Sequence, residues 1–263
     1  LAHSWPIAIS IIFNLLYLKG DILFLAYFRD QAEVGLYGAA YRVLEVMTVL
    51  PTMLMGLVLP SLVAMWSQGR TQEFRKRVAQ IFDLFALMVV PVVVGAQLTS
   101  TELMTLIAGA DFAIAGPILT WLILALVGVF LGTLYGHLVV AINKQRIMTW
   151  GYVFVAIVAV VGYRLYIPVY GMWGAVWVTL ASEALIAGLT FLVVYRTSRA
   201  LPSLRVLLKA LAASGIMYLA LVGLDVPVLI DLLVGGLVYG ATIITLKAVS
   251  IRQITSLIGS PRL

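Results

Sequence analysis

Apolar residues run along most of the chain in long stretches that are separated by short polar breaks. A helix needs roughly 20 mostly apolar residues to cross a lipid bilayer. The stretches are continuous rather than alternating at every second residue, which favours helices over membrane-spanning strands. Eight stretches are long enough, so the sequence predicts eight transmembrane helices, over residues 6–28, 36–64, 78–98, 114–142, 147–167, 173–195, 206–224 and 226–247.

Composition supports an all-α polytopic membrane protein. Of 263 residues, 63% are hydrophobic and 11% are charged, whereas soluble proteins are about half apolar and about a quarter charged. The absence of cysteine excludes disulfides, thiolate metal sites and cysteine nucleophiles, and two histidines are too few for a histidine-rich metal centre. The sequence also lacks a phosphate-binding glycine loop and the common hydrolase motifs. We therefore expect no enzyme activity, metal or cofactor.

The basic residues predict the orientation in the membrane. Thirteen of the 17 lysines and arginines follow the second, fourth, sixth and eighth predicted helices: Arg70, Arg75, Lys76, Arg77, Lys144, Arg146, Arg196, Arg199, Arg205, Lys209, Lys247, Arg252 and Arg262. Short loops rich in lysine and arginine stay on the cytoplasmic side. We expect a multi-pass protein of the cytoplasmic membrane with both ends of this sequence in the cytoplasm. The net charge of +6 is then a topology signal, and no nucleic-acid partner is expected.

Charged residues inside predicted spans are candidates for function, because each costs several kcal/mol there. Lys19 and Asp21 lie towards the end of the first predicted helix. Arg42 and Glu45 lie three residues apart near the start of the second. Because the two helices run in opposite directions, all four residues fall in one layer of the bilayer. They could form a net-neutral cluster that either lines a polar cavity or simply holds the two helices together by ion pairs.

Three further features stand out in the later helices. Glu183 lies near the membrane midplane, where it could be protonated, paired with a basic group, or part of an ion or proton path. Gly128, Gly132 and Gly136 are spaced by four residues, which predicts a smooth ridge for close helix packing. His137, which has no nearby histidine or acidic partner in the sequence, is expected to be a hydrogen-bonded packing residue.

Several motifs resemble a known family. The segments are DILFL at 21–25, VGLYGAAYR at 34–42, a helix with two prolines at 50–62, and IPVYGMWGAV at 167–176. In this order they are similar to motifs of the multidrug/oligosaccharidyl-lipid/polysaccharide flippase superfamily, in its polysaccharide-flippase (O-antigen translocase) branch. Lys19 and the bulky Trp173 and Trp177 depart from the family pattern.

The resemblance implies an architecture and an activity. Residues 1–200 would form the C-terminal six-helix lobe, residues 201–263 two additional helices and a short cytoplasmic tail, and the N-terminal lobe would be missing from this sequence. Two such lobes enclose a cationic cavity that opens alternately to each side. The expected substrate is a polyprenyl-pyrophosphate-linked oligosaccharide, which the protein would flip across the membrane for polysaccharide or O-antigen synthesis.

The resemblance also implies roles for the intramembrane charges. Arg42 and Lys19 would contact the phosphates, since phosphate recognition favours arginine and lysine. Asp21, Glu45 and Glu183 would pair with these bases or couple transport to an ion or proton. The main alternative is a cation-coupled multidrug exporter of the same superfamily, which would carry carboxylates without bases in this lobe. A membrane-embedded glycan polymerase or ligase and a structural subunit are weaker alternatives.

Overall fold

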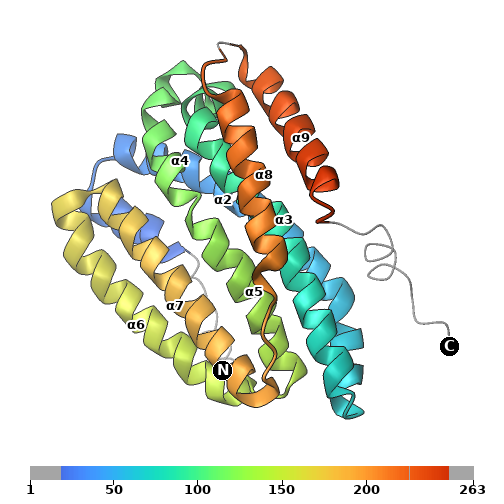
Figure 1. The fold of residues 1–263 in the computed structure, drawn as a ribbon. Coiled ribbons are helices and arrows are strands. Elements are labelled where there is room, and N and C mark those ends of the chain that lie inside the picture. The colour runs from blue at the N-terminus through green and yellow to red at the C-terminus, as the bar shows by residue number, and fades with distance from the viewer. Residues whose placement is uncertain (1–18, 225, 249–263) are drawn as a thin grey trace.

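The computed structural model describes residues 19–224 and 226–248, and within them the chain is helical with no strand, as predicted (Figure 1). A helical segment over residues 19–28 comes first. The elements that follow are α2 (Gln31–Ser67), α3 (Thr71–Ala108), the 3-10 helix η1 (Ala110–Ala115), α4 (Gly116–Leu122), α5 (Ala125–Ala141), α6 (Gln145–Tyr170), α7 (Met172–Ser198), α8 (Leu204–Leu221) and α9 (Val228–Thr245).

Six of these helices are long and apolar enough to cross a membrane by themselves: α2, α3, α6, α7, α8 and α9. The predicted span 114–142 is instead a bent pair, in which α5 turns by 47° from η1 and α4. The bend follows from tight turns at Ile123 and Leu124. There Leu124 donates to the carbonyl of Trp121 and Leu126 to that of Ile123, a three-residue spacing that changes the helix direction. The predicted span 6–28 lies mostly outside the described residues.

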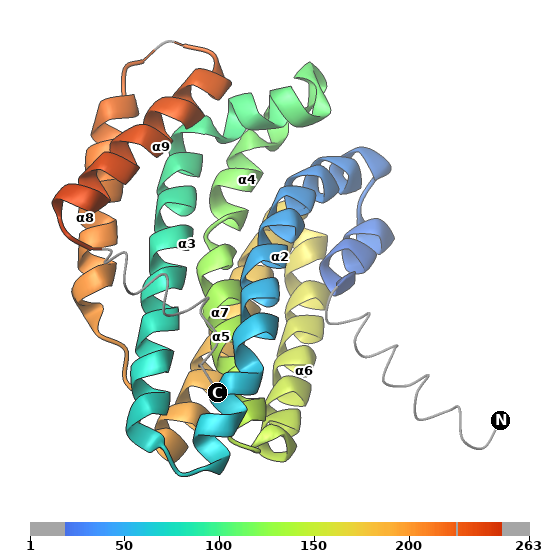
Figure 2. The same ribbon diagram turned by 90° about the vertical axis from the view of Figure 1, so that its right-hand side faces the viewer.

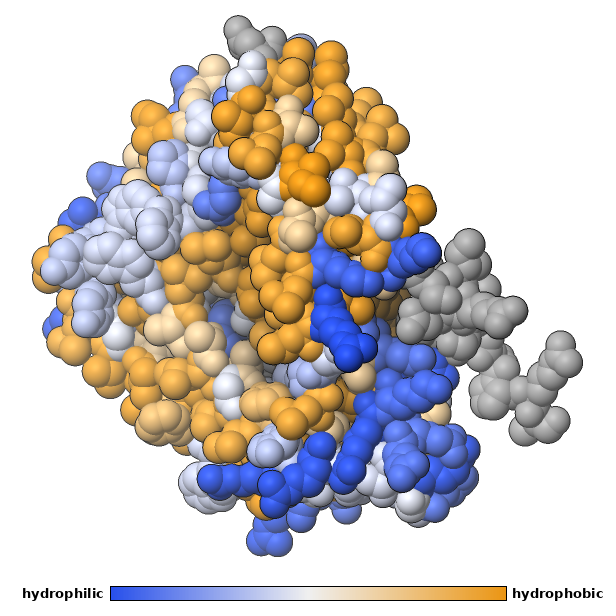
Figure 3. Space-filling view, viewed as in Figure 1, coloured by the Kyte–Doolittle hydropathy of each residue, from blue (hydrophilic) through white to orange (hydrophobic). Residues whose placement is uncertain are grey.

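The connections between helices gather at two opposite ends of the bundle (Figures 1 and 2). Those after α2, α5 and α7 lie at one end, and those after α3, α6 and α8 at the other. Strongly hydrophilic side chains gather towards the first of these ends, while the rest of the visible face is largely apolar (Figure 3). This arrangement matches the alternation of basic and non-basic loops in the sequence.

Helices α5 and α7 pack closely along the predicted glycine ridge. A Cβ atom added at Gly128 would lie 2.8 Å from the Cβ of Glu183, and one at Gly132 would lie 3.3 Å from a methyl group of Ile186. Real Cβ atoms essentially never come as close as the first distance. The glycines therefore allow the backbone of α7 to rest against α5, as predicted, and they hold Glu183 at the contact.

The last two helices attach to the rest of the bundle through α3. Pro91 in α3 has no N–H group, so the carbonyl of Leu87, four residues earlier, lacks its usual helical donor. The hydroxyl of Tyr239 in α9 donates to this carbonyl at 2.8 Å. The proline thus leaves a carbonyl oxygen free to accept a hydrogen bond from α9. The predicted boundary at residue 200, between a six-helix lobe and two additional helices, stays a prediction.

Candidate substrate-binding cleft

A polar cleft of about 510 Å³ lies among α2, α5, α6 and α7. Lys19, Glu45 and Glu183, three of the five predicted site residues, line it. Glu183 also lines a second cavity of about 570 Å³, whose other lining residues are almost all apolar. The polar cleft therefore brings Lys19, Glu45 and Glu183 to one site in the described part of the chain.

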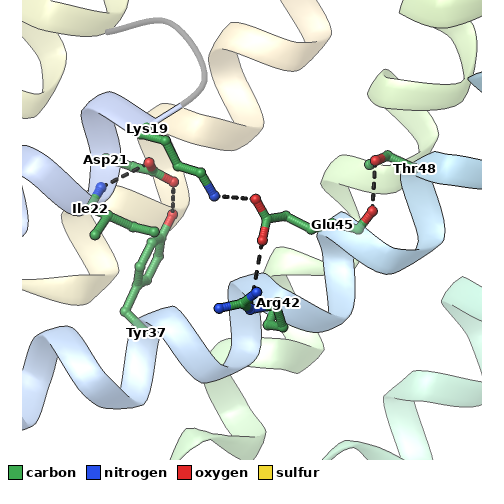
Figure 4. Close-up of polar contacts among 7 residues, drawn as sticks. All are labelled: Lys19, Asp21, Ile22, Tyr37, Arg42, Glu45 and Thr48. Carbon is green, nitrogen blue, oxygen red and sulfur yellow. Dashed lines mark hydrogen bonds and ion pairs between the residues drawn. The ribbon is translucent and has the colours of Figure 1, made fainter. Parts of the chain in front are cut away.

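Glu45 is the centre of an ion-pair cluster at this cleft (Figure 4). Its Oε1 atom accepts a hydrogen bond from Lys19 Nζ, and its Oε2 atom lies 3.9 Å from Arg42 Nε. Lys19 Nζ also lies 5.1 Å from the centre of the Tyr41 ring, within range of a cation–π interaction. Two cations share one carboxylate, so these three residues have a net charge of +1.

Exposure distinguishes the members of this cluster. The side chains of Lys19 and Glu45 are each 36% exposed, whereas that of Arg42 is 80% exposed. Arg42 does not line the cleft, and its side chain is largely exposed.

Asp21 does not join this cluster, which corrects the expected four-residue arrangement. Its side chain is buried and accepts hydrogen bonds from the hydroxyl of Tyr37 at 2.7 Å and the backbone N–H of Ile22 at 2.8 Å. The physical reason is helical geometry, because residues 19 and 21 are separated by about 200° around the axis. When Lys19 faces the cleft, Asp21 faces the opposite side.

The Asp21 side chain belongs to a buried network of hydroxyl groups. The hydroxyls of Tyr37 in α2 and Tyr163 in α6 lie 3.3 and 3.2 Å from Thr179 Oγ1 in α7. The network therefore joins the 19–28 segment to three other helices. No ion pair to Asp21 is found in the described part of the chain, so its proposed coupling role stays a prediction.

Glu183 is the third charged residue that lines the cleft, after Lys19 and Glu45. It makes no hydrogen bond or ion pair with any residue that the structure describes, so pairing with a basic group, one of the three alternatives, is not found there. Glu183 lies against Gly128 and opens onto both cavities. Its role in coupling stays a prediction.

Several polar residues of the cleft were not predicted as site residues, among them Thr133, His137 and Tyr152. Thr133 and His137 each follow a glycine of the α5 ridge, so the spacing of the ridge could have indicated that they share a face. His137 Nδ1 lies 2.7 Å from the carbonyl oxygen of Thr133, as expected for a hydrogen-bonded histidine, but the ring also lines the cleft. Across the described ranges, no group of three or more His, Asp or Glu side chains is placed to bind a metal ion.

Comparisons with known proteins agree with the motifs. A family model described as "Polysaccharide biosynthesis protein" matches residues 1–117. Probable flippase AglR of Haloferax volcanii is 23% identical over 241 residues, which cover 87% of this chain and 50% of AglR. A solved structure of lipid II flippase MurJ, in an inward closed conformation, matches with a TM-score of 0.74 and 18% identity, over 92% of this chain and 53% of MurJ.

The chain spans about half the length of both relatives. The likeness to MurJ shows a shared fold, and the family match includes the motifs at 21–25 and 34–42. Motifs, sequence and fold thus confirm the predicted resemblance of this chain to polysaccharide flippases of the multidrug/oligosaccharidyl-lipid/polysaccharide flippase superfamily.

Proposed function

We propose that this chain is the C-terminal part of a transporter that flips a lipid-linked glycan across the cytoplasmic membrane by alternating access. The substrate is an oligosaccharide joined by a diphosphate to a polyprenyl carrier. The observation that carries this proposal is the cluster of Lys19 and Arg42 around the single carboxylate of Glu45 at the cleft. Both named relatives are flippases, which supports transport rather than catalysis.

The geometry of the cluster suits a diphosphate. Lys19 and Arg42 approach different oxygens of Glu45, so they already surround an anion with two acceptor atoms. Charge-assisted hydrogen bonds from lysine and arginine are among the strongest contacts to phosphate. A diphosphate carries more negative charge than one carboxylate and can take the place of Glu45 beside both cations. Glu45 would then hold the cations in position while the substrate is absent.

The rest of the pathway comes from a second lobe in this proposal. Residues 1–200 form the C-terminal six-helix lobe and residues 201–263 two additional helices and a tail. The chain covers about half of each relative, and the side chain of Arg42 is 80% exposed, which leaves it accessible to an opposing wall. The N-terminal lobe would supply that wall, and both ends of this sequence would lie in the cytoplasm.

The proposal is tested by neutralising Arg42 in the natural full-length protein. Loss of one charged contact to phosphate is worth roughly 1.5–3 kcal/mol, so Arg42→Gln is expected to slow flipping of the lipid-linked glycan in vesicles by about tenfold or more. Arg205→Gln, at an exposed position at the start of α8, is the matched control. Equal flipping rates for both variants and wild type would refute a phosphate role for Arg42.

One observation favours the alternative of a cation-coupled multidrug exporter. Glu183 is a carboxylate without a basic partner among the described residues, and it lines the same cleft. An exporter of this kind predicts that Glu183→Gln abolishes efflux of a lipophilic cation such as ethidium from cells. The glycan flippase proposal predicts no ethidium efflux in wild type, so the two functions give opposite results in one assay.

A further inference from the structure

We infer that the cleft contains a sugar-binding subsite formed by Thr133, His137 and Tyr152. This inference rests on the proposed function and deepens it, because it assigns residues to the glycan rather than to the diphosphate. The three residues come from two helices, α5 and α6, and all line the polar cleft. None of them carries a formal charge when the histidine is neutral.

The three side chains meet at the surface of α5. Thr133 and His137 are four residues apart, so they lie on one helical face. The hydroxyl of Tyr152 lies 3.3 Å from the position that a Cβ atom at Gly136 would occupy. The glycine therefore lets the Tyr152 hydroxyl reach the surface of α5 beside His137.

Two of the three side chains, Thr133 and Tyr152, have no hydrogen-bond partner in the part of the chain that the structure describes. By contrast, the hydroxyls of Thr48 and Thr52, also in the cleft, donate to carbonyls of their own helix. Both hydroxyls line an open cleft, and Tyr152 is 39% exposed, so water or a polar ligand can reach them.

His137 adds a ring nitrogen that accepts a hydrogen bond in the neutral form. His137 Nδ1 faces only a carbonyl acceptor, that of Thr133, so Nδ1 carries the proton in the neutral ring and Nε2 is an acceptor. The subsite then offers one ring acceptor and two hydroxyls that donate or accept. This uncharged set suits the hydroxyl and amide groups of a sugar better than phosphate or a cation. The ring of Tyr152 adds an apolar surface with a polar tip.

The histidine of the subsite is offset from Glu183 along α5. Gly128 contacts Glu183, and His137 follows nine residues later in α5, a rise of about 13 Å. Because Lys19 and His137 line the same cleft, a ligand that fills it can place an anionic group beside Lys19 and a hydroxyl-rich group beside His137.

The experiment measures affinities of the natural full-length protein in detergent for two kinds of probe. One is a short-chain prenyl diphosphate, and the other is a panel of the same lipid carrying one hexose or N-acetylhexosamine. We expect wild type to bind at least one glycosylated probe about tenfold more tightly than the bare diphosphate. The double variant Thr133→Val, Tyr152→Phe is expected to lose this gain and to keep its affinity for the bare diphosphate. Tyr166→Phe, a change of the same kind in α6 outside the polar cleft, should keep the gain.

The outcomes separate this inference from the proposal on which it rests. Unchanged affinity of the double variant for bare diphosphate shows that it is folded. If the gain persists in the double variant, or no glycosylated probe shows a gain in wild type, the sugar subsite is refuted. If Lys19→Gln and Arg42→Gln leave every affinity unchanged, the proposed diphosphate site fails instead.

Discussion

The carboxylate of Glu33 fills the space that a side chain at residue 171 would need. Gly171 has a φ of +57° and forms the turn between α6 and α7. Glu33 Oε1 accepts the first backbone N–H of α7, from Met172, at 2.6 Å, and Oε2 accepts from Arg29 Nε at 2.6 Å. The start of α2 is thus fastened to a turn that lies about 140 residues later in the chain. The contact joins the residue just before the motif at 34–42 to the motif at 167–176.

Gly171→Ala should destabilise the protein. The new Cβ would collide with Glu33, and a backbone conformation suited to glycine costs other residues roughly 1–3 kcal/mol. We expect a clear fall in the midpoint of thermal unfolding in detergent. Gly188→Ala in α7, where a Cβ would meet nothing within 4 Å, is the matched control. Equal midpoints for the two variants would show that Glu33 does not restrict position 171.

Gly128→Ala should disturb the contact between α5 and α7 more than Gly132→Ala does. The added Cβ at residue 128 would lie 3.0 Å from the backbone carbonyl carbon of Glu183, which cannot move away by rotating a side chain. At residue 132 the nearest atom is a methyl group of Ile186, 3.3 Å away. We expect both the thermal midpoint and the flipping rate to fall further for Gly128→Ala. The reverse order would contradict the packing described here.

Tyr37→Phe should weaken the buried network around Asp21. The change removes the hydroxyl that donates to Asp21 Oδ2 and leaves that oxygen without this donor. An unsatisfied buried polar group costs about 1–3 kcal/mol, so the thermal midpoint should fall. Tyr27→Phe is the control, because the Tyr27 side chain is 82% exposed. A midpoint for Tyr37→Phe that matches the control would mean that the Tyr37–Asp21 hydrogen bond contributes little.

The orientation in the membrane is tested by labelling single cysteines, since this sequence contains none. Gln68 and Leu201 are exposed residues in the connections after α2 and α7, which lie at the end with the basic loops. Cysteines there should react with an impermeant thiol reagent only after the cytoplasmic membrane is opened. Asp111 is exposed in η1, in the connection after α3 at the opposite end, and a cysteine there should react with the membrane intact. The inverse pattern would reverse the proposed topology.

Within the described residues, the sequence predicted the positions of the six single membrane-crossing helices, because length and apolarity are properties of each segment alone. It did not predict the bend between α4 and α5, since neither Ile123 nor Leu124 is a proline or glycine. The depth of each residue along its helix placed Lys19 and Glu45 together, and the structure shows this pair. The same reasoning misplaced Asp21, because depth carries no information about which face of the helix a residue occupies.

The uncharged residues of the cleft could not be predicted from the positions of charged residues in the sequence. A charged residue inside a membrane span indicates a functional site because it is energetically costly there. A threonine or tyrosine, such as Thr133 or Tyr152, gives no such indication. Their place in the cleft depends on how α5 and α6 pack, through the contact of Tyr152 with Gly136. A stripe of glycines beside polar residues was the signal that could have pointed to them.

We propose that Lys19 binds substrate and does not merely join two helices through Glu45. The most direct measurement compares flipping of the lipid-linked glycan by the natural full-length protein and by the double variant Lys19→Met, Glu45→Met. This change removes both charges at once, so a purely structural ion pair predicts a folded protein with nearly normal flipping. Our account predicts a folded protein, with a thermal midpoint close to that of wild type, in which flipping is lost. Normal flipping by this variant would contradict the proposed role of Lys19.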